Sequence, residues 1–420
     1  MSADKKVPDI RFKGFSGEWE KRSFGDCFNY IPNNTLSRAE LNYEHGIARN
    51  IHYGDVLIKF GEILDANDAS LPFITDEIFV YKQKNAALRN GDIVIADAAE
   101  DSTVGKCTEL FNIDKQVILS GLHTIAIRPT VTFASKYLGY YLNSSSYHDQ
   151  LLPLMQGTKV LSISKSALQY TNINFPNKNE EQIKIGNTFQ KLDNLINQHQ
   201  QKHDTLSNIK KAMLEKMFPK PGKTVPEIRF KGFNDEWEEK SVSQLGEIIT
   251  GSTPSTQNLA NYSNDGIPWV TPTDIFRNVT FNTAKRLSQV GCKAARIVPK
   301  NTILVTCIAS IGKNTILGSQ GSFNQQINGI VPNEKENNPY FLYSASALWS
   351  EKLKRSAASG TMQIVNKTEF SELKNRVPQK EEQTAIGNYF QKLDTLIEQH
   401  QQQITKLNNI KQACLSKMFI

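Results

Sequence analysis

Two stretches of the chain carry apolar side chains at alternating spacings of four and three residues. They cover residues 179–218 and 380–420, and their 3.5-residue period is typical of a coiled-coil seam. The apolar seam positions are Phe189, Leu192, Ile196, Leu206, Phe390, Leu393, Ile397 and Leu407. Each stretch therefore predicts one long helix, and a helix with a single apolar stripe needs a partner.

The two predicted helices are copies of each other. Residues 180–218 and 381–419 align without a gap, and about two-thirds of their positions are identical. A shorter phrase also recurs, because VPDIRFKGFSGEW at 7–19 returns as VPEIRFKGFNDEW at 225–237. A period of about 200 residues indicates duplicated domains, whereas solenoid repeats are roughly 20 to 50 residues long.

Each helix finds its partner in the other copy. An antiparallel pair would make the molecule pseudo-two-fold, and at 1.5 Å per residue each rod would be about 57 Å long. His199 and His400 occupy matching seam positions, where they are expected to form a polar layer that fixes the register. Trp19 and Trp237 both stand in the repeated phrase, so we expect them to be structural anchors.

The blocks between phrase and helix resemble each other only faintly. Their β-branched runs at 93–95 and 303–305 predict buried strands, and glycine and asparagine around them mark turns. We therefore expect an α/β (mixed α+β) fold with two mostly β-cored domains separated by the antiparallel helices. The predicted parts are a first domain over 1–178, a helix over 179–218, a linker over 219–226, a second domain over 227–379 and a helix over 380–420.

Composition narrows the setting of the protein. The chain is 39% hydrophobic and 22% charged, which is ordinary for a globular protein. Its five cysteines include no C-x-x-C pair, so a reducing cytoplasm is expected instead of disulfides or zinc ribbons. No apolar run approaches the roughly 20 residues that span a bilayer. The net charge of +7 is compatible with a polyanionic partner.

Three motifs suggest catalysis or metal binding, and each fails. NNPY at 337–340 resembles the N-P-P-Y loop of adenine methyltransferases, but it lacks an upstream glycine-rich turn, so Pro339 is expected to open a helix instead. CIASIGKN at 307–314 has Cys307 and Asn314 where a phosphate loop needs glycine and serine or threonine. HQQKH lacks the glutamate of a zinc protease. We therefore expect no catalytic or metal-binding residues.

Taken together, the repeated phrases resemble the DNA-specificity subunit of type I restriction-modification systems over essentially the whole chain. The resemblance is carried by the two IRFKGF…EW starts, the two EEQ…IG…F…LD…I helices, and the endings EKMF and SKMF. Within the blocks it is carried by IHYGDVLIKFGEILD (51–65), LSGLHTIAIRP (119–129), TGSTPSTQNLANYSNDGIPWVTPTDI (250–275), ASIGK (309–313) and FNQQIN (323–328).

This resemblance implies a chain that catalyses nothing itself and binds double-stranded DNA through two target-recognition domains. Each domain would read one half of a split site, and because the two blocks differ, that site should be asymmetric. The helices would hold the two halves apart and dock two adenine methyltransferase subunits, which bind S-adenosylmethionine. Endonuclease subunits that translocate DNA would complete the complex with ATP and Mg²⁺. This chain would bind no cofactor.

Sequence readout is expected from loops in the two dissimilar blocks. Arginine and lysine can bond guanine with two hydrogen bonds, and asparagine and glutamine can do so with adenine. Candidates in the first block are Lys59, Lys106, His123, Thr158 and Lys159. Candidates in the second block are Thr253, Ser255, Thr271, Thr273, Lys313, Gln325 and Gln326.

Two alternatives stay open at this level. A coiled-coil scaffold that never meets DNA would explain the helices and the duplication, but not why the blocks diverged while the helices did not. A specificity chain of a fused restriction-methylation enzyme of another type is the third hypothesis. Identifying the proteins that co-purify with the chain would distinguish this third hypothesis from the first, which is the specificity subunit of a type I system.

Overall fold

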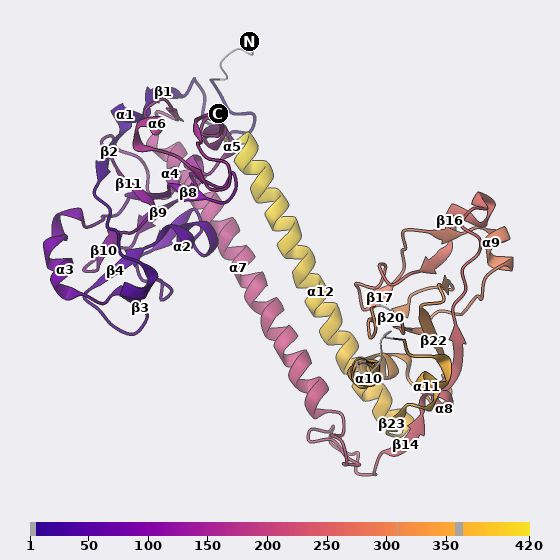
Figure 1. Ribbon diagram of the computed structural model, residues 1–420. Helices are drawn as coiled ribbons and strands as arrows, with labels where there is room; N and C mark the ends of the chain where they lie inside the picture. Colours follow the sequence, from indigo (N-terminus) through magenta and orange to yellow (C-terminus); the bar gives the residue numbers. More distant parts are fainter. Residues whose placement is uncertain (1–5, 309, 358–363) are drawn as a thin grey trace. The chain divides into compact units, whose positions relative to one another are not determined.

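The computed structural model of the protein describes residues 6–308, 310–357 and 364–420 (Figure 1). Ala309, which begins the ASIGK phrase, lies outside these ranges. The chain forms two compact units, Met1–Gln198 with Gln403–Ile420, and His199–Gln402. This division crosses both long helices, whereas the sequence predicted helices separate from the domains. The reason is that each unit buries one end of each helix in its own core.

The first unit is built around a five-stranded sheet in the order β2–β11–β7–β9–β5. Its strands are β2 Phe28–Ile31, β11 Thr124–Pro129, β7 Ile93–Ala96, β9 Cys107–Phe111 and β5 Ile63–Asp65. Neighbours run antiparallel, except that β5 is parallel to β9. A four-stranded sheet adds β10 Val117–Ser120, β4 Ala48–Ile51, β6 Phe73–Ile74 and β3 Leu41–Asn42.

Short elements complete the first unit. Two strand pairs are β1 Glu20–Ser23 with β13 Asn172–Phe175, and β8 Ala98–Ala99 with β12 Leu161–Ser162. The helices are α1 Phe24–Cys27, α2 Tyr53–Ile58, α3 Glu77–Lys82, α4 Tyr137–Leu142, α5 Ser145–His148 and α6 Lys165–Leu168. The 3₁₀ turns are η1 Arg38–Glu40, η2 Lys84–Ala86 and η3 Leu152–Leu154.

The second unit repeats the five-stranded sheet in the order β15–β22–β19–β20–β17. Its strands are β15 Gly246–Thr250, β22 Ile327–Pro332, β19 Ile303–Thr306, β20 Asn314–Leu317 and β17 Val279–Thr280. The strand directions match those of the first unit, including one parallel edge pair, β17 with β20. The two sheets are therefore the same structure built from dissimilar sequences.

Further elements surround this second sheet. The remaining strands are β14 Glu238–Ser241, β16 Tyr262–Val270, β18 Arg286–Leu287, β21 Ser322–Phe323 and β23 Lys374–Val377. The helices are α8 Val242–Leu245, α9 Gln289–Lys293, α10 Pro339–Ala357 and α11 Lys367–Glu372, with a 3₁₀ turn η4 Leu259–Asn261. Pro339 begins α10, as expected from the position of proline at a first turn.

Each central strand is apolar on both faces because both faces of the sheet are covered. In β7, Ile93 and Ile95 pack into one core cluster, whereas Val94 and Ala96 pack into another. In β19, Ile303 belongs to the cluster around the long helices, and Leu304 belongs to the cluster on the other face. The runs at 93–95 and 303–305 are therefore the buried strands that the sequence predicts.

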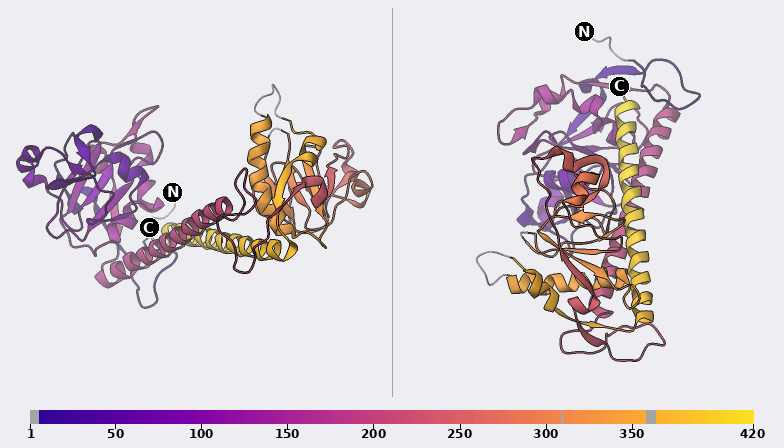
Figure 2. Two further views of the ribbon diagram at one scale, coloured as in Figure 1. Left: turned by 90° about the horizontal axis from the view of Figure 1, so that it is seen from below. Right: turned by 90° about the vertical axis from the view of Figure 1, so that its right-hand side faces the viewer.

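The long helices are α7 Asn179–Lys216 and α12 Lys380–Lys417. In the first unit the beginning of α7 packs against the end of α12, and the rings of Phe189 and Phe419 stack 5.7 Å apart. In the second unit the end of α7 packs against the beginning of α12, with Phe218 and Phe390 6.1 Å apart. Within each unit the helix ends lie side by side and antiparallel, as the seam predicts (Figure 2).

The recurring phrase docks on these helix ends in the same way twice. Arg11 makes two hydrogen bonds of 2.7 and 2.8 Å to buried Glu181, and Arg229 makes two of 2.6 and 2.7 Å to buried Glu382. The two carboxylates also stand in the first turns of α7 and α12, where the helix dipole favours negative charge. The phrase recurs because each unit needs one copy to cover its paired helix ends.

The tryptophans of the phrase are buried in these same contacts. Trp19 meets Phe419 edge-on, and Trp237 meets Phe218 edge-on. They are structural anchors, as their place in the repeated phrase suggests. In the ranges that the structure describes, no helix combines the length and the apolar character that crossing a membrane requires.

Candidate nucleic-acid interface

The dissimilar loops lie at one end of each five-stranded sheet, where the strands begin or finish. Because neighbouring strands run antiparallel, the chain leaves β2 and β7 and enters β11 and β9 at this same end. β5 also starts there, since it is parallel to β9. We call this the loop edge; it comprises residues 32–37, 52–62, 97–106 and 121–123 in the first unit. In the second unit it comprises residues 251–258, 271–278, 307–308, 310–313 and 324–326.

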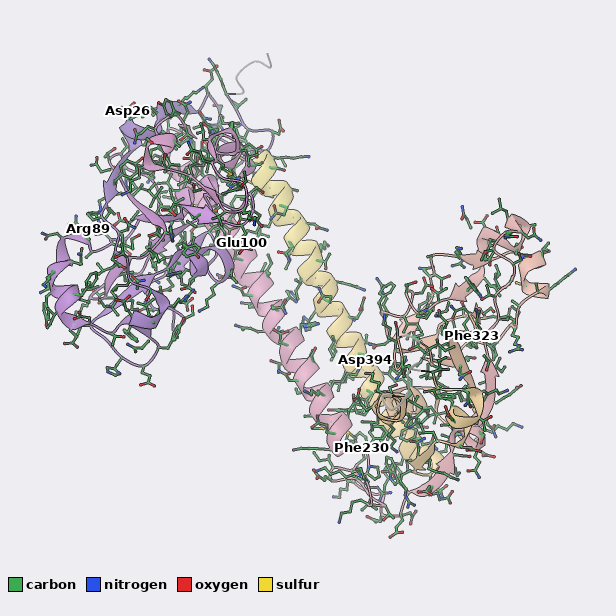
Figure 3. All side chains as sticks on the ribbon, viewed as in Figure 1. Asp26, Arg89, Glu100, Phe230, Phe323 and Asp394 are labelled. Carbon is green, nitrogen blue, oxygen red and sulfur yellow. The ribbon has the colours of Figure 1, made fainter. Side chains whose placement is uncertain are left out.

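The loop edges bring the predicted readout residues together in each unit. Lys59, Lys106 and His123 lie on the first loop edge. Thr158 and Lys159 are exposed in a hairpin that reaches it, since β12 pairs with β8 just after β7. The second loop edge carries Thr253, Ser255, Thr271, Thr273, Lys313, Gln325 and Gln326. Figure 3 labels Glu100, at the first loop edge, and Phe323, directly before the 324–326 turn.

A buried carboxylate organises two cations, Lys59 within the first loop edge and Arg38 directly after its residues 32–37. Asp55 accepts a hydrogen bond of 2.8 Å from Arg38 and lies 3.3 Å from the ammonium group of Lys59. Lys59 also donates to the hydroxyl of Tyr43 at 3.1 Å, and this bond raises the pKa of the lysine. Arg38 is a candidate that sequence reasoning missed; its only signal was the pairing with a buried aspartate, which the fold alone reveals.

His123 is the exposed histidine of the first loop edge. Its backbone has a φ of 53°, in the left-handed region, so the residue sits at a sharp turn before β11. The ring lies 3.3 Å from the carboxylate of Asp97 and meets Tyr53 edge-on at 5.3 Å. Burial raises the pKa of Asp97. These contacts hold a hydrogen-bonding ring at the surface.

The two matched lysines before β9 and β20 differ in accessibility. Lys106 is half-buried, and its ammonium group donates a hydrogen bond of 2.8 Å to the carbonyl of Leu57, which ties the loop to the end of α2. Burial lowers the pKa of Lys106. Lys313 is exposed and reaches the carbonyl of Pro272 at 3.4 Å. Lys313 is therefore presented at the surface, whereas Lys106 mainly joins two parts of its own unit.

Neutral hydrogen-bonding groups dominate the second loop edge. Thr271 donates to Asp274 at 2.6 Å and lies 2.8 Å from the hydroxyl of Thr273. The side chain of Gln326 is half-buried, and its Oε1 accepts a hydrogen bond of 2.9 Å from the side-chain amide of Asn324. Thr253, Ser255 and Gln325 are exposed. Arg296 is a candidate that sequence reasoning missed. It lies more than forty residues from Thr250 in the chain, yet its guanidinium group donates a hydrogen bond of 2.6 Å to the backbone carbonyl of Thr250.

The predicted helix seam contains buried and half-exposed positions. Phe189, Phe390 and Leu393 are buried, and Leu192 and Leu206 pack on the cores of their units. Ile196, His199, Ile397, His400 and Leu407 are half-exposed. In the second unit the Nδ1 atoms of His199 and His400 lie 2.8 Å apart, which makes these residues a hydrogen-bonded polar layer.

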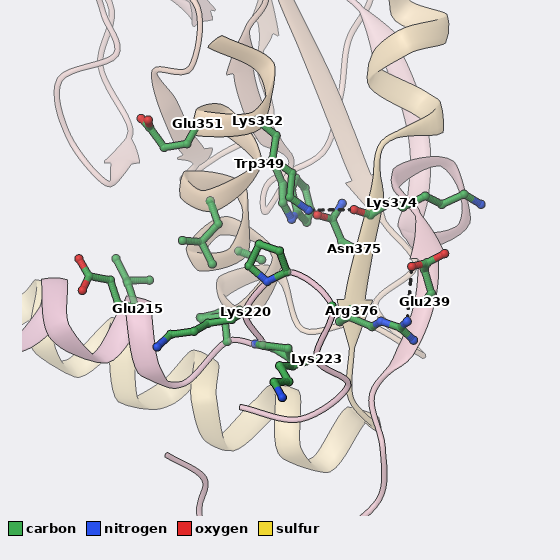
Figure 4. A pocket seen from close by; sticks show the side chains of 17 residues that line it. Glu215, Lys220, Lys223, Glu239, Trp349, Glu351, Lys352, Lys374, Asn375 and Arg376 are labelled. Atoms are coloured by element: carbon green, nitrogen blue, oxygen red, sulfur yellow. Dashed lines mark hydrogen bonds and ion pairs between the residues drawn. The ribbon is translucent and has the colours of Figure 1, made fainter. Parts of the chain in front are cut away.

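A groove of about 690 Å³ lies at another place in the second unit (Figure 4). Its lining includes the aromatic side chains of Phe218 and of Trp349 from α10, and the cations Lys223, Lys374 and Arg376. None of its lining residues belongs to the loop edge. No described set of three or more His, Cys, Asp or Glu residues is placed to hold a metal ion.

The fold and the loop edges define a class of protein: a duplicated chain that carries two dissimilar polar loop edges on one repeated framework. Comparison with known proteins identifies the family. The model of the type I restriction modification DNA specificity domain matches residues 16–208 and 234–409. This chain belongs to that family.

Named relatives agree with this assignment. The specificity subunit of type I restriction enzyme MjaIX from Methanocaldococcus jannaschii is 30% identical over 197 residues, 44% of each chain. The HindI specificity subunit from Haemophilus influenzae is 33% identical over 150 residues, 34% of this chain and 32% of that protein. These matches span less than half of each relative. The crystal structure of a type I S subunit from M. genitalium has the same fold, with a TM-score of 0.68, 14% identity and 99% of each chain covered.

Proposed function

We propose that this chain is the DNA-specificity subunit of a type I restriction-modification complex and that each loop edge reads one part of a split, asymmetric DNA site. The observation that carries the proposal is the contrast between framework and edge. The two sheets share one strand order and one set of directions, whereas the loops at their edges differ in sequence and charge. This contrast is expected of a protein whose recognised DNA sequence changes in evolution while the fold that carries the loops is kept.

The chemistry of the edges suits double-stranded DNA. Arg38, Lys59 and Lys313 can approach phosphates, and such contacts supply most of the affinity. His123 and Gln325 carry groups that can bond base edges in the major groove, where each base pair presents a distinct pattern. The overall charge of +7 favours the same partner.

The similarity of the two long helices supports a second part of the proposal, that two adenine methyltransferase subunits dock on this chain. About two-thirds of the aligned helix positions are identical, so two copies of one partner would find a similar surface twice. These partners would bring S-adenosylmethionine and flip the target adenine out of the duplex. Endonuclease subunits would bring ATP and Mg²⁺, and this chain itself would catalyse nothing. That the helices keep the two loop edges at a constant separation stays a prediction.

Sequencing of modified bases in cells tests the proposal. Cells that carry this chain and its methyltransferase should contain methyladenine at one interrupted, asymmetric motif, and cells with the methyltransferase alone should not. Absence of such a motif would contradict the proposal. Gel shifts with the intact complex should weaken steeply with salt, because phosphate contacts release counterions. Salt-independent or absent binding would favour a scaffold that never meets DNA.

A further inference from the structure

The turn 324–326 of the second loop edge is held rigidly by its backbone. Asn324 N donates to the carbonyl of Val270 at 2.9 Å, and Ile327 N closes the turn on the carbonyl of Asn324 at 3.2 Å. From the facing loop, Ser252 N donates to the carbonyl of Phe323 at 2.8 Å. Gln325 stands exposed at the tip of this turn. Its Cα position is therefore fixed although its side chain faces solvent.

The facing loop, residues 250–255, is equally constrained. Four of its backbone carbonyls, those of Thr250, Ser252, Pro254 and Ser255, each accept a hydrogen bond from a side chain outside the loop. The donors and distances are Arg296 at 2.6 Å, Trp269 at 3.0 Å, Tyr262 at 2.8 Å and Asn261 at 3.0 Å. A surface loop with this many external donors is built to keep one shape, which is what a binding surface on a stable scaffold needs.

Thr253 joins the two constrained segments. Its hydroxyl donates a hydrogen bond to Oε1 of Gln325, and both side chains are exposed. This bond fixes the orientation of the carboxamide. It uses one lone pair of Oε1, so the other lone pair and the two hydrogens of Nε2 remain for a ligand. A side chain that is oriented before binding loses less entropy on binding.

We propose that Gln325, positioned by Thr253, reads an adenine in the half-site bound by the second unit. Adenine presents an N6 donor beside an N7 acceptor in the major groove, and a carboxamide matches this pair with two bonds. Oε1 would accept from N6, and Nε2 would donate to N7. The inference rests on the proposed function, and it adds which base this edge selects and which residue selects it.

The first unit cannot use the same contact. The segments SGLHTIAIRP (120–129) and FNQQINGIVP (323–332) correspond strand for strand, and Leu122 stands where the second unit has Gln325. A leucine side chain has no hydrogen-bonding group. Loss of the Gln325 carboxamide should therefore affect one half of the recognised site only.

The test compares Gln325→Leu, Thr253→Val and Gln320→Ala in the intact complex. Gln320 is exposed between β20 and β21, away from the loop edge, so Gln320→Ala is the matched control. By sequencing of modified bases, Gln325→Leu should lose roughly ten- to a hundredfold of the preference for adenine at one position of one half-site. Thr253→Val should relax the same position less, and Gln320→Ala should keep the wild-type motif.

A chemical substitution of the DNA gives an independent readout. Duplexes with 7-deazaadenine at the relaxed position lack the N7 acceptor. The wild-type complex should bind these duplexes more weakly than it binds normal duplexes. The Gln325→Leu complex should bind both kinds of duplex equally well. An unchanged motif in Gln325→Leu, or a change in the other half-site, would overturn the inference. Failure of the proposed function is distinguishable, because then the wild-type chain would direct no motif at all.

Discussion

The hydroxyl of Tyr340 donates a hydrogen bond of 2.7 Å to the buried carboxylate of Asp394, the aspartate of the repeated LD pair in α12. Lys210 of α7 completes the site with its ammonium group 2.5 Å from the other carboxylate oxygen. Figure 3 labels Asp394 on α12, beside α10. The first unit makes the same hydrogen bond, from Tyr140 to Asp193 at 2.6 Å. One carboxylate in each unit thus joins both long helices to the domain.

Replacement of Asp394 by asparagine should destabilise the second unit by about 2–3 kcal/mol, because it leaves the partly buried Lys210 without its counter-charge. Denaturant unfolding of the intact chain followed by tryptophan fluorescence measures this. The second unit holds Trp237, Trp269 and Trp349, whereas the first holds only Trp19. Exposed Asp265 supplies the control, Asp265→Asn. Equal midpoints for Asp394→Asn and the wild type would show that the site is not structural.

The buried Glu109 should make the first unit less stable as pH rises. Burial raises its pKa to about 7, although the carboxylate accepts hydrogen bonds from the backbone N–H groups of Lys136 and Gly139. The unfolded chain releases this proton near pH 4.5, so between about pH 4.5 and 7 the folded state binds more protons and stability falls with increasing pH. Above pH 7 the full cost, on the order of a few kcal/mol, is present.

Urea unfolding of the wild type and Glu109→Gln at pH 5, 6, 7 and 8 measures this slope. The difference between the two proteins isolates Glu109 from other titrating groups. Glu109→Gln should gain relative stability toward pH 8, whereas parallel pH profiles would contradict the burial argument. The second unit has Ile316 at the corresponding strand position, so it should lack this dependence.

The histidine layer should respond to pH in the opposite sense. Burial and the nearby charges of His199, Lys202 and His203 lower the pKa of His400. The unfolded chain then binds the proton more readily, so the layer loses stability as pH falls below about 6.5. Amide hydrogen exchange around residue 400 should quicken on going from pH 7.5 to 5.5, after correction for intrinsic rates. A double variant with leucine at both positions should remove this effect.

The bidentate contact of Arg229 with Glu382 should resist conservative replacement. Lysine keeps the charge but cannot form two parallel hydrogen bonds, so Arg229→Lys should loosen the docked phrase by about 1–2 kcal/mol. Faster limited proteolysis within residues 225–237 would show this. Lys231 is exposed two positions away, and Lys231→Arg should leave the cleavage rate unchanged. Equal rates for both variants would indicate that charge alone holds the phrase.

Much of the fold was predictable because its signals are local or repeated. The helix period, the strand runs at 93–95 and 303–305, and the duplication lie in the sequence itself. The pairing of the helices followed from the need to bury one apolar stripe on each. The division into units was not predictable, because it depends on which core buries Phe189 or Phe390, and that is a property of tertiary packing.

The position of the candidate loops in the fold was more predictable than the orientation of their side chains. The chosen loops do lie on one edge of each sheet, since punctuation by glycine and asparagine marks the strand ends. The orientation of individual side chains was not available. Lys106 turns to the carbonyl of Leu57, Arg38 pairs with the buried Asp55, and Arg296 is brought in from a distant segment. Such contacts depend on long-range geometry that no local pattern encodes.

The most direct test of the account replaces residues 20–176 with the corresponding block of a relative that has a different target. Bases modified in cells that carry the chimera and the methyltransferase are then mapped by single-molecule sequencing. One half of the motif should change to that of the relative while the other half stays as in the wild type. A motif that changes in both halves, or in neither, would contradict independent recognition by two loop edges.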